Sequence, residues 1–283
     1  MKFAVEYSQF TSEKLGVKDA LLEQIDEIDI DWDPQDLTLL EFLQKYKNKR
    51  INIIISNNED FEKYKLLSKI ATFKEEFPEL DIAFAFRYNL VELFPEVLEQ
   101  IKQKNIKFYY NYAICDWEEF NVWMKSGISD MVIGNQLCFE LEKCRMLANK
   151  YGFRLRTDIG VVQKKYITTE DYCSFFIRPE DIDKYSKFID VFNLYFSKLE
   201  NPRDLNVLFD IYSKDKYWYG NLQEILPQLM NPLDSKCLLS SFADNRIKCG
   251  RRCLSGSSCR ICKNQMNLAK TLSDNNLMFE DKK

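Results

Sequence analysis

The chain contains no histidine among its 283 residues. Because imidazole is the base in Ser-His-Asp and Cys-His catalysis, hydrolases of both classes are excluded, and so are zinc proteases with an HExxH motif. Any general acid or base must therefore be Asp, Glu, Lys, Tyr or Cys. Glycine is scarce as well, with eight residues, and the sequence has neither a Walker loop nor a GxGxxG motif for binding nucleotides.

Long apolar runs are also missing. The stretch 1–10 has no extended apolar segment, and no run in the chain reaches the roughly 20 residues that span a membrane. We therefore expect neither a signal peptide nor a membrane partner. A hydrophobic content of 46% is enough for a full core, and the net charge of −4 gives no general reason to expect nucleic acid as a partner.

Cysteine, by contrast, is concentrated near the C-terminus, in the stretch Lys236–Lys263. The five cysteines of this stretch are Cys237, Cys249, Cys253, Cys259 and Cys262. The last four form a C-x3-C-x5-C-x2-C array that offers soft thiolates to one metal centre, and Cys237 can replace one of them. A [4Fe–4S] cluster is the favoured interpretation, because zinc sites usually have a longer loop between two close pairs. A structural zinc site and metal-free thiols are the alternatives.

The other four cysteines are scattered through apolar stretches, and the odd total of nine argues against a disulfide framework. We therefore expect a reducing compartment and predict a cytoplasmic protein. The cysteine stretch is also basic, with seven Lys and Arg side chains and a single acid, Asp244. Two explanations stay open: a surface for RNA, or cations that balance the negative charge of a metal bound by four thiolates.

Short β-rich runs alternate with amphipathic helical stretches over about the first 200 residues. This alternation predicts a (β/α)8 TIM-like barrel, with an open doubly wound sheet as the alternative. The predicted strands are Lys2–Tyr7, Ile51–Ser56, Leu80–Phe86, Ile106–Tyr112, Ser129–Gly134, Phe153–Asp158, Ser174–Arg178 and Asp190–Tyr195. The acidic stretch Glu23–Asp33 is interpreted as part of the first crossover. We divide the chain into a barrel (1–215), a Cys-rich C-terminal extension packed on the barrel (216–275) and a disordered tail (276–283).

In such a barrel the chemistry takes place at the carboxyl ends of the strands. Arg87, Arg156 and Arg178 end or follow predicted strands, so a closed barrel would bring them to one mouth. Together with Asn111 they are the candidate substrate-binding residues, because an arginine fork binds a carboxylate or a phosphate. The alternative is that each arginine pairs with a local acid. The candidate catalytic acid and base are Asp158 and Glu180.

Three stretches resemble the peptidase U-32 (collagenase-like) family, in particular its short members from phages and firmicutes. They are Ser126–Leu141, Phe153–Gln163 and Phe175–Tyr195, and the last contains the motif IRPEDI at Ile177–Ile182. The resemblance implies a barrel fold and, from the better understood relatives, a [4Fe–4S] cluster on four cysteines. It also implies oxygen-independent hydroxylation of tRNA, rRNA or a quinone ring, in some relatives with prephenate as the source of the hydroxyl.

The tail resembles the cysteine segment of that family at Cys237-Leu-Leu-Ser, Arg246, Cys249 and Cys253. It departs from the family pattern because Met230–Lys236 lacks a preceding cysteine, whereas Cys259 and Cys262 add a close pair. Two hypotheses follow. One is an iron–sulfur enzyme that acts on RNA or a small anionic aromatic substrate, with a protein partner as a further expectation. The other is a non-catalytic binding or structural barrel stabilised by a four-cysteine zinc site.

Overall fold

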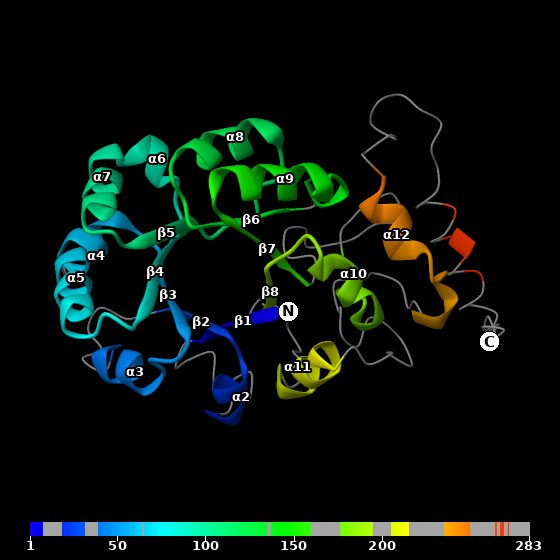
Figure 1. Ribbon diagram of the computed structural model, residues 1–283, viewed down its shortest axis with the longest axis horizontal. Coiled ribbons are helices and arrows are strands. Elements are labelled where there is room, and N and C mark those ends of the chain that lie inside the picture. The colour runs from blue at the N-terminus through cyan, green and yellow to red at the C-terminus, as the bar shows by residue number, and fades with distance from the viewer. Residues whose placement is uncertain are drawn as a thin grey trace.

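The computed structural model contains one parallel sheet that curves round into a ring, with helices outside it (Figure 1). It describes residues 1–7, 19–31, 39–63, 65–134, 137–159, 176–194, 205–214 and 235–249, and the single positions 264, 267, 268 and 271. Within these residues the strand order is β5-β4-β3-β2-β1-β8-β7-β6. The strands are β1 Lys2–Tyr7, β2 Glu27–Asp31, β3 Arg50–Ile55, β4 Asp81–Phe86, β5 Lys107–Tyr110, β6 Asp130–Val132, β7 Arg154–Asp158 and β8 Val191–Leu194.

The two edge strands of this order, β5 and β6, are joined by hydrogen bonds at both ends. The Ser129 amide, just before β6, donates to the Phe108 carbonyl oxygen at 2.9 Å, and the Ile114 amide donates to the Val132 carbonyl oxygen at 2.8 Å. Ile114 also forms a parallel bridge with Ile133. Closing the sheet removes its exposed edges. The fold is therefore a (β/α)8 barrel, as the alternation of strands and helices predicted.

Helices follow the strands and cover the outer face of the sheet (Figure 1). The described α-helices are α2 Asp19–Gln24, α3 Leu39–Lys45, α4 Asn58–Lys63, α5 Leu66–Glu76, α6 Leu90–Leu93, α7 Pro95–Gln103, α8 Trp117–Lys125, α9 Leu141–Tyr151, α10 Ile182–Ser186, α11 Leu205–Ser213 and α12 Phe242–Ile247. Short 3-10 turns are η1 Leu137–Phe139, η3 Pro179–Asp181 and η5 Ser235–Cys237. None of the helices in the described part of the chain is both long and apolar enough to cross a membrane.

Local sequence explains where several helices begin and end. The Asp116 side chain accepts a hydrogen bond from the Glu119 amide at 2.9 Å, which caps the first turn of α8. Pro95 opens α7 at a position where no backbone donor is needed. Gly152 ends α9 with a φ of 77°, a left-handed conformation that glycine adopts without steric cost.

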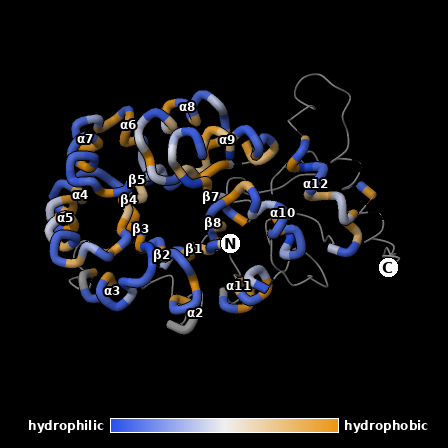
Figure 2. The backbone as a smooth tube through the Cα atoms, in the orientation of Figure 1, coloured by the Kyte–Doolittle hydropathy of each residue, from blue (hydrophilic) through white to orange (hydrophobic). Residues whose placement is uncertain are grey.

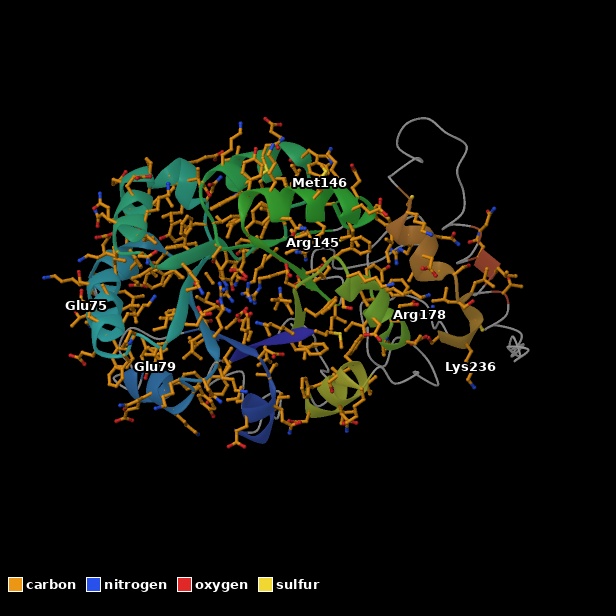
Figure 3. All side chains as sticks on the ribbon, viewed as in Figure 1. Glu75, Glu79, Arg145, Met146, Arg178 and Lys236 are labelled. Atoms are coloured by element: carbon orange, nitrogen blue, oxygen red, sulfur yellow. The ribbon has the colours of Figure 1, made fainter. Side chains whose placement is uncertain are left out.

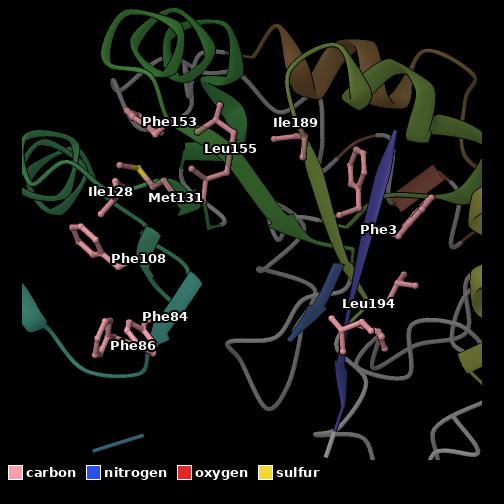
Figure 4. Packing of buried hydrophobic residues seen from close by; sticks show 14 of the residues in the cluster. Phe3, Phe84, Phe86, Phe108, Ile128, Met131, Phe153, Leu155, Ile189 and Leu194 are labelled. Atoms are coloured by element: carbon pink, nitrogen blue, oxygen red, sulfur yellow. The ribbon is translucent and has the colours of Figure 1, made fainter. Parts of the chain in front are cut away.

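The main core lies between the outer face of the barrel and the helices. Hydrophobic residues line the inner sides of the helices (Figure 2), and buried Ile, Leu and Phe side chains from the strands pack against them (Figure 4). Phe84 of β4, for example, meets Phe61 of α4 edge to face, with ring centroids 5.2 Å apart. Burying one such side chain contributes roughly 1.5–3 kcal/mol. Packing of this kind holds the helices on the barrel.

The described residues contain eight strands, the number expected, but one of them, β2, was not predicted. The second strand is β2, with the sequence EIDID, inside the stretch interpreted as part of a crossover. Ile28 and Ile30 face the helices, whereas Glu27 and Asp29, which alternate with them, face the barrel interior and bind arginines. The predicted strand Ser174–Arg178 lies partly outside the described residues, and its described part, 176–178, is not in a strand. β2 was missed because acidic residues are uncommon in strands. They are tolerated inside this barrel because residues from other strands pair with them.

Residues 235–249 of the C-terminal extension pack beside α10 (Figure 1). Lys184 of α10 donates to the Ser240 carbonyl oxygen at 2.8 Å and pairs with Asp244 at 3.0 Å. Phe176 and Phe242 stack with ring centroids 5.5 Å apart. The boundaries 216–275 of the extension, and the tail 276–283, stay predictions.

Candidate functional site

Nitrogen and oxygen atoms gather in the middle of the ring of strands (Figure 3). They lie beside a small apolar cluster of strand residues, namely Ile54, Ala83, Ala85, Tyr109 and Val132. Arg156 of β7 is 0% exposed there. Its Nη1 lies 2.7 Å from Glu27 Oε2, and its Nη2 lies 3.1 Å from Asp29 Oδ2. Asn193 Oδ1 accepts hydrogen bonds from Nη2 at 3.0 Å and from Nε at 3.2 Å. The guanidinium also lies 4.9 Å from the ring centroid of Tyr109.

Two further arginines extend this network toward the amino ends of the strands. Arg154 Nη1 lies 2.5 Å from Glu27 Oε1, and its Nη2 lies 2.6 Å from Asp130 Oδ1. Arg50 of β3 pairs with the other oxygen of Asp130 and donates to Asn52 Oδ1 at 3.0 Å. Three arginines and three carboxylates thus meet inside the barrel. We call this group (Arg50, Arg154, Arg156, Glu27, Asp29 and Asp130) the interior ion network.

The network stabilises the charged form of Glu27. Burial by itself would raise the pKa of Glu27, but the charges of Arg156, Arg154 and Arg50 outweigh burial and lower the pKa from 4.5 to about 2. Sequence reasoning did not identify Glu27, Asp29 or Asp130 as a group. The strict alternation of acids and isoleucines in EIDID was the available indication, since period-2 patterns place alternate residues on one face.

A second charged group lies at the carboxyl end of the barrel. Arg87, just after β4, pairs through Nη2 with Glu6 Oε1 at 2.8 Å and through Nη1 with Asp31 Oδ2 at 3.6 Å. Here burial raises the pKa of Glu6, with further increases from Asp29 and Asp31, although Arg87 acts in the opposite direction. We call Glu6, Asp31 and Arg87 the mouth triad. Within the described residues it joins two carboxylates to one guanidinium.

Asn111 and Asp158 also lie at this end of the barrel, because both are at the carboxyl ends of strands. Asn111 directly follows β5, and its amide donates to the Phe86 carbonyl oxygen at 2.7 Å. Asp158 is the last residue of β7, and its Oδ1 accepts from Asn193 Nδ2 at 2.9 Å. Asn193 in turn contacts Arg156, so Asp158 is connected to the interior ion network through one amide. Their roles in binding and catalysis stay predictions.

Arg178 and Glu180 pair with each other, with Nη1 3.3 Å from Oε1, and both contact the C-terminal segment. Arg178 is 3% exposed, and its Nε lies 2.6 Å from Asp181 Oδ2. Its remaining donors reach carbonyl oxygens of the C-terminal segment 235–239. Glu180 accepts a hydrogen bond from the Ser235 hydroxyl. The structure therefore does not join the three predicted arginines in one anion site: Arg87, Arg156 and Arg178 each pair with acids of their own.

The cysteines of the predicted metal centre are described only in part. Cys237 is buried in η5, and Cys249 is half-buried just beyond α12. Cys253, Cys259 and Cys262 lie outside the described residues. Among the residues that are described, no group of three or more Cys, Asp or Glu side chains is arranged to hold a metal ion. The ligand set therefore stays a prediction.

Arg246 of α12 lies between Cys237 and Cys249 in the sequence, and its side chain is fully buried. Its guanidinium lies 4.9 Å from the ring centroid of Phe242, 5.1 Å from that of Phe176 and 5.2 Å from that of Phe139. Its Nη1 donates to the Phe176 carbonyl oxygen at 3.4 Å. Aromatic faces attract a cation, so these three rings hold a positive charge within the cysteine stretch Lys236–Lys263.

Comparison with known proteins yields only distant structural matches. No family model matches the chain, and no curated protein matches it. 3-Keto-L-gulonate-6-phosphate decarboxylase from Vibrio cholerae is 11% identical with a TM-score of 0.41, covering 76% of this chain and 96% of that chain. Tryptophan synthase subunit alpha from Legionella pneumophila is 12% identical with a TM-score of 0.40, covering 76% of this chain and 86% of that chain. These values are too low to carry an argument, so the barrel assignment depends on the strand order and closure, and the U-32 resemblance stays a prediction.

Proposed function

We propose that the chain is a U-32-like barrel protein that holds a [4Fe–4S] cluster on its C-terminal cysteines and serves as an oxygen-independent hydroxylation factor. Its substrate would be RNA or a small anionic aromatic compound. One observation carries the proposal: two stretches that resemble the family contact each other, although Arg178 and Leu238 are 60 residues apart. The IRPEDI motif at Ile177–Ile182 binds the segment in which Cys237 lies.

Arg178 makes most of this contact. Its Nη1 donates to the carbonyl oxygens of Ser235 at 3.3 Å and Leu238 at 3.4 Å, and its Nη2 donates to that of Leu239 at 3.4 Å. These acceptors lie on both sides of Cys237 in the sequence. A guanidinium held by Asp181 therefore fixes the backbone that carries the first sulfur. The motif is then a support for the cysteine segment, and the contacts of Glu180 favour a positioning role over acid–base catalysis.

The donor set suits an iron–sulfur cluster in its chemistry. Thiolates are the usual ligands of [4Fe–4S] clusters, and any four of Cys237, Cys249, Cys253, Cys259 and Cys262 would complete one. When bound, such a cluster supplies one-electron redox chemistry. A cluster on four thiolates is negatively charged, and the caged Arg246 offers the balancing cation. Asp158 is the acid–base candidate that remains at the carboxyl end of the barrel.

The second candidate is a non-catalytic barrel stabilised by zinc on the same cysteines. The interior ion network favours it, because Arg156 is fully buried and bound to Glu27, Asp29 and Asn193. An arginine with these partners has little capacity left for a substrate anion. Of the predicted arginines, only Arg87 is as much as 27% exposed.

Anaerobic purification followed by absorption spectroscopy and metal analysis tests the two candidates. An iron–sulfur cluster on thiolates should give a brown protein that absorbs at roughly 400 nm, with about four irons per chain. Colourless protein with one zinc per chain would replace the first candidate by the second. Protein with neither metal, and with the C-terminal thiols open to titration, would contradict both.

The supporting role of the motif is tested by Arg178→Gln. We expect at least a several-fold loss of bound metal per chain, because the carbonyls around Cys237 lose their common donor. Limited proteolysis should then cut first within 235–249 while the barrel stays intact. Arg145→Gln is the matched control, since Arg145 also binds a carbonyl oxygen and an acid, those of Phe188 and Asp190. Equal metal content in the two variants would remove the support for the proposal.

A further inference from the structure

A cavity opens at the carboxyl end of β3, beside α4 and the start of α5, and it belongs to neither the cysteine segment nor the interior ion network. Its volume is about 200 Å³. The lining residues are Asp31, Ile54, Ile55, Ser56, Asn57, Asp60, Phe61 and Leu66. The carboxyl ends of barrel strands are where ligands of this fold bind, so the position is that of a binding site.

The charge of the cavity is negative. Asp31 and Asp60 are its two charged lining residues, and none of the eight lining residues, all of them described, is Lys or Arg. Asp60 is held by a neutral partner, because its Oδ2 accepts from Asn57 Nδ2 at 2.7 Å. Asp31 is 41% exposed and lies 3.6 Å from Arg87, which makes its shorter contact, 2.8 Å, with Glu6. Asp31 is therefore accessible to a second charged partner from the cavity.

Of the other six lining residues, Ser56 and Asn57 are polar and four are apolar. Ile54, Ile55, Phe61 and Leu66 are all buried and belong to the strand and the two helices beside it. These four side chains favour contact with a short hydrocarbon chain. A volume of about 200 Å³ lies below the roughly 300–1,000 Å³ of sites for drug-sized ligands. The ligand that fits is therefore small.

From these features we propose that the cavity binds a small alkylamine, with a primary ammonium group on Asp31 or Asp60 and its carbon chain against Ile54, Ile55 and Phe61. An ammonium is a compact cation with three donors, and a carboxylate beside an apolar wall binds it through charge-assisted hydrogen bonds. The proposed ligand is a cation, whereas the arginines of the sequence predicted an anionic ligand. The preference for a cation is independent of the metal centre, since no lining residue belongs to the cysteine segment.

The test uses putrescine (1,4-diaminobutane) as the probe and the methyl NMR signals of isoleucine and leucine in the full chain. Putrescine should shift the signals of Ile54, Ile55 and Leu66 and leave those of Ile101 and Ile128, which lie outside the cavity lining, unchanged. 1,4-Butanediol has the same chain without the charge and should bind at least tenfold more weakly. Succinate, the matching dianion, should not shift these signals. Equal shifts from butanediol or succinate, or no shift from putrescine, would overturn the proposal.

Substitutions then locate the charge that matters. Asp31→Asn and Asp60→Asn keep the shape of each side chain, and at least one should weaken putrescine binding about tenfold or more. Glu99→Gln is the control, because Glu99 is an exposed acid of α7 paired with Lys102. Unchanged affinity in both aspartate variants would contradict the proposal. If either variant does not fold, the comparison of putrescine with butanediol on the natural chain still decides the question.

Discussion

Inside the barrel three arginines meet three carboxylates, whereas the mouth triad at its carboxyl end contains one arginine and two carboxylates. The difference appears in the titration of one acid from each region. Arginine charges lower the pKa of Glu27 to about 2, but burial raises the pKa of Glu6. Both glutamates contact an arginine, so one such contact does not determine whether the pKa rises or falls. The direction of the shift depends on the number of cations around each buried acid.

This contrast separates what holds the barrel together from what it leaves for a ligand. The interior ion network joins β2, β3, β6 and β7 across the centre, and its charges balance within the described residues. The mouth triad adjoins a cavity with further negative charge. A balanced network fixes structure, whereas an unbalanced group attracts counter-charge from outside.

The largest expected effect comes from breaking the balance in the interior. Arg156→Met should lower the free energy of unfolding by roughly 3–5 kcal/mol, because Glu27 and Asp29 would be left buried with fewer cations. Urea unfolding followed by tryptophan fluorescence measures the change. Lys107→Met, which breaks the exposed pair with Asp81, should change stability by less than about 1 kcal/mol. A loss below about 1 kcal/mol in Arg156→Met would mean that the network is not needed for stability.

A smaller effect should follow from protonating Glu27 with acid. The pKa of Glu27 is about 2 in the folded chain and about 4.5 when unfolded, so the unfolded state binds the proton first as the pH falls. The stabilisation is complete above about pH 4.5 and is lost progressively toward pH 2. It amounts to roughly 3 kcal/mol. Urea unfolding between pH 5 and pH 2.5 should follow this loss.

Carboxyl 13C NMR on the natural chain checks the same comparison without a substitution. The signal of Glu27 should titrate near pH 2, and that of Glu6 should titrate above the ordinary glutamate value of 4.5. Similar midpoints for the two glutamates would mean that the two regions do not differ in charge balance.

The smallest expected effect is at the mouth. Because the folded pKa of Glu6 is raised, its charged form destabilises the folded state at pH 7, and this cost disappears as the pH falls through the folded pKa. Glu6→Gln removes the charge and leaves Arg87 with Asp31. We expect the free energy of unfolding at pH 7 to rise, or to change by less than about 1 kcal/mol. A loss comparable to that of Arg156→Met would show that the mouth is as structural as the interior.

Particular residues show how far sequence reasoning could go. Strands rich in Ile and Phe, such as β3 and β4, were predicted within one residue, because burial on both faces leaves a short apolar run. β2 was missed because Glu27 and Asp29 are acids that only arginines from β3 and β7 make acceptable in the interior. Arg156 was expected at the mouth of the barrel, whereas the structure buries it at the middle of β7. Its carboxylate partners come from β2, 127 and 129 residues away.

The sequence by itself determined the alternation of strands and helices, the absence of histidine chemistry and the concentration of cysteines near the C-terminus. These are properties of composition and local spacing. Only the tertiary structure decided which acid meets which arginine, that Arg178 binds the cysteine segment, and that Asp31 and Asp60 line one cavity. Such pairings join residues far apart in the chain, and their free energy depends on burial and on neighbouring charges that no local pattern contains.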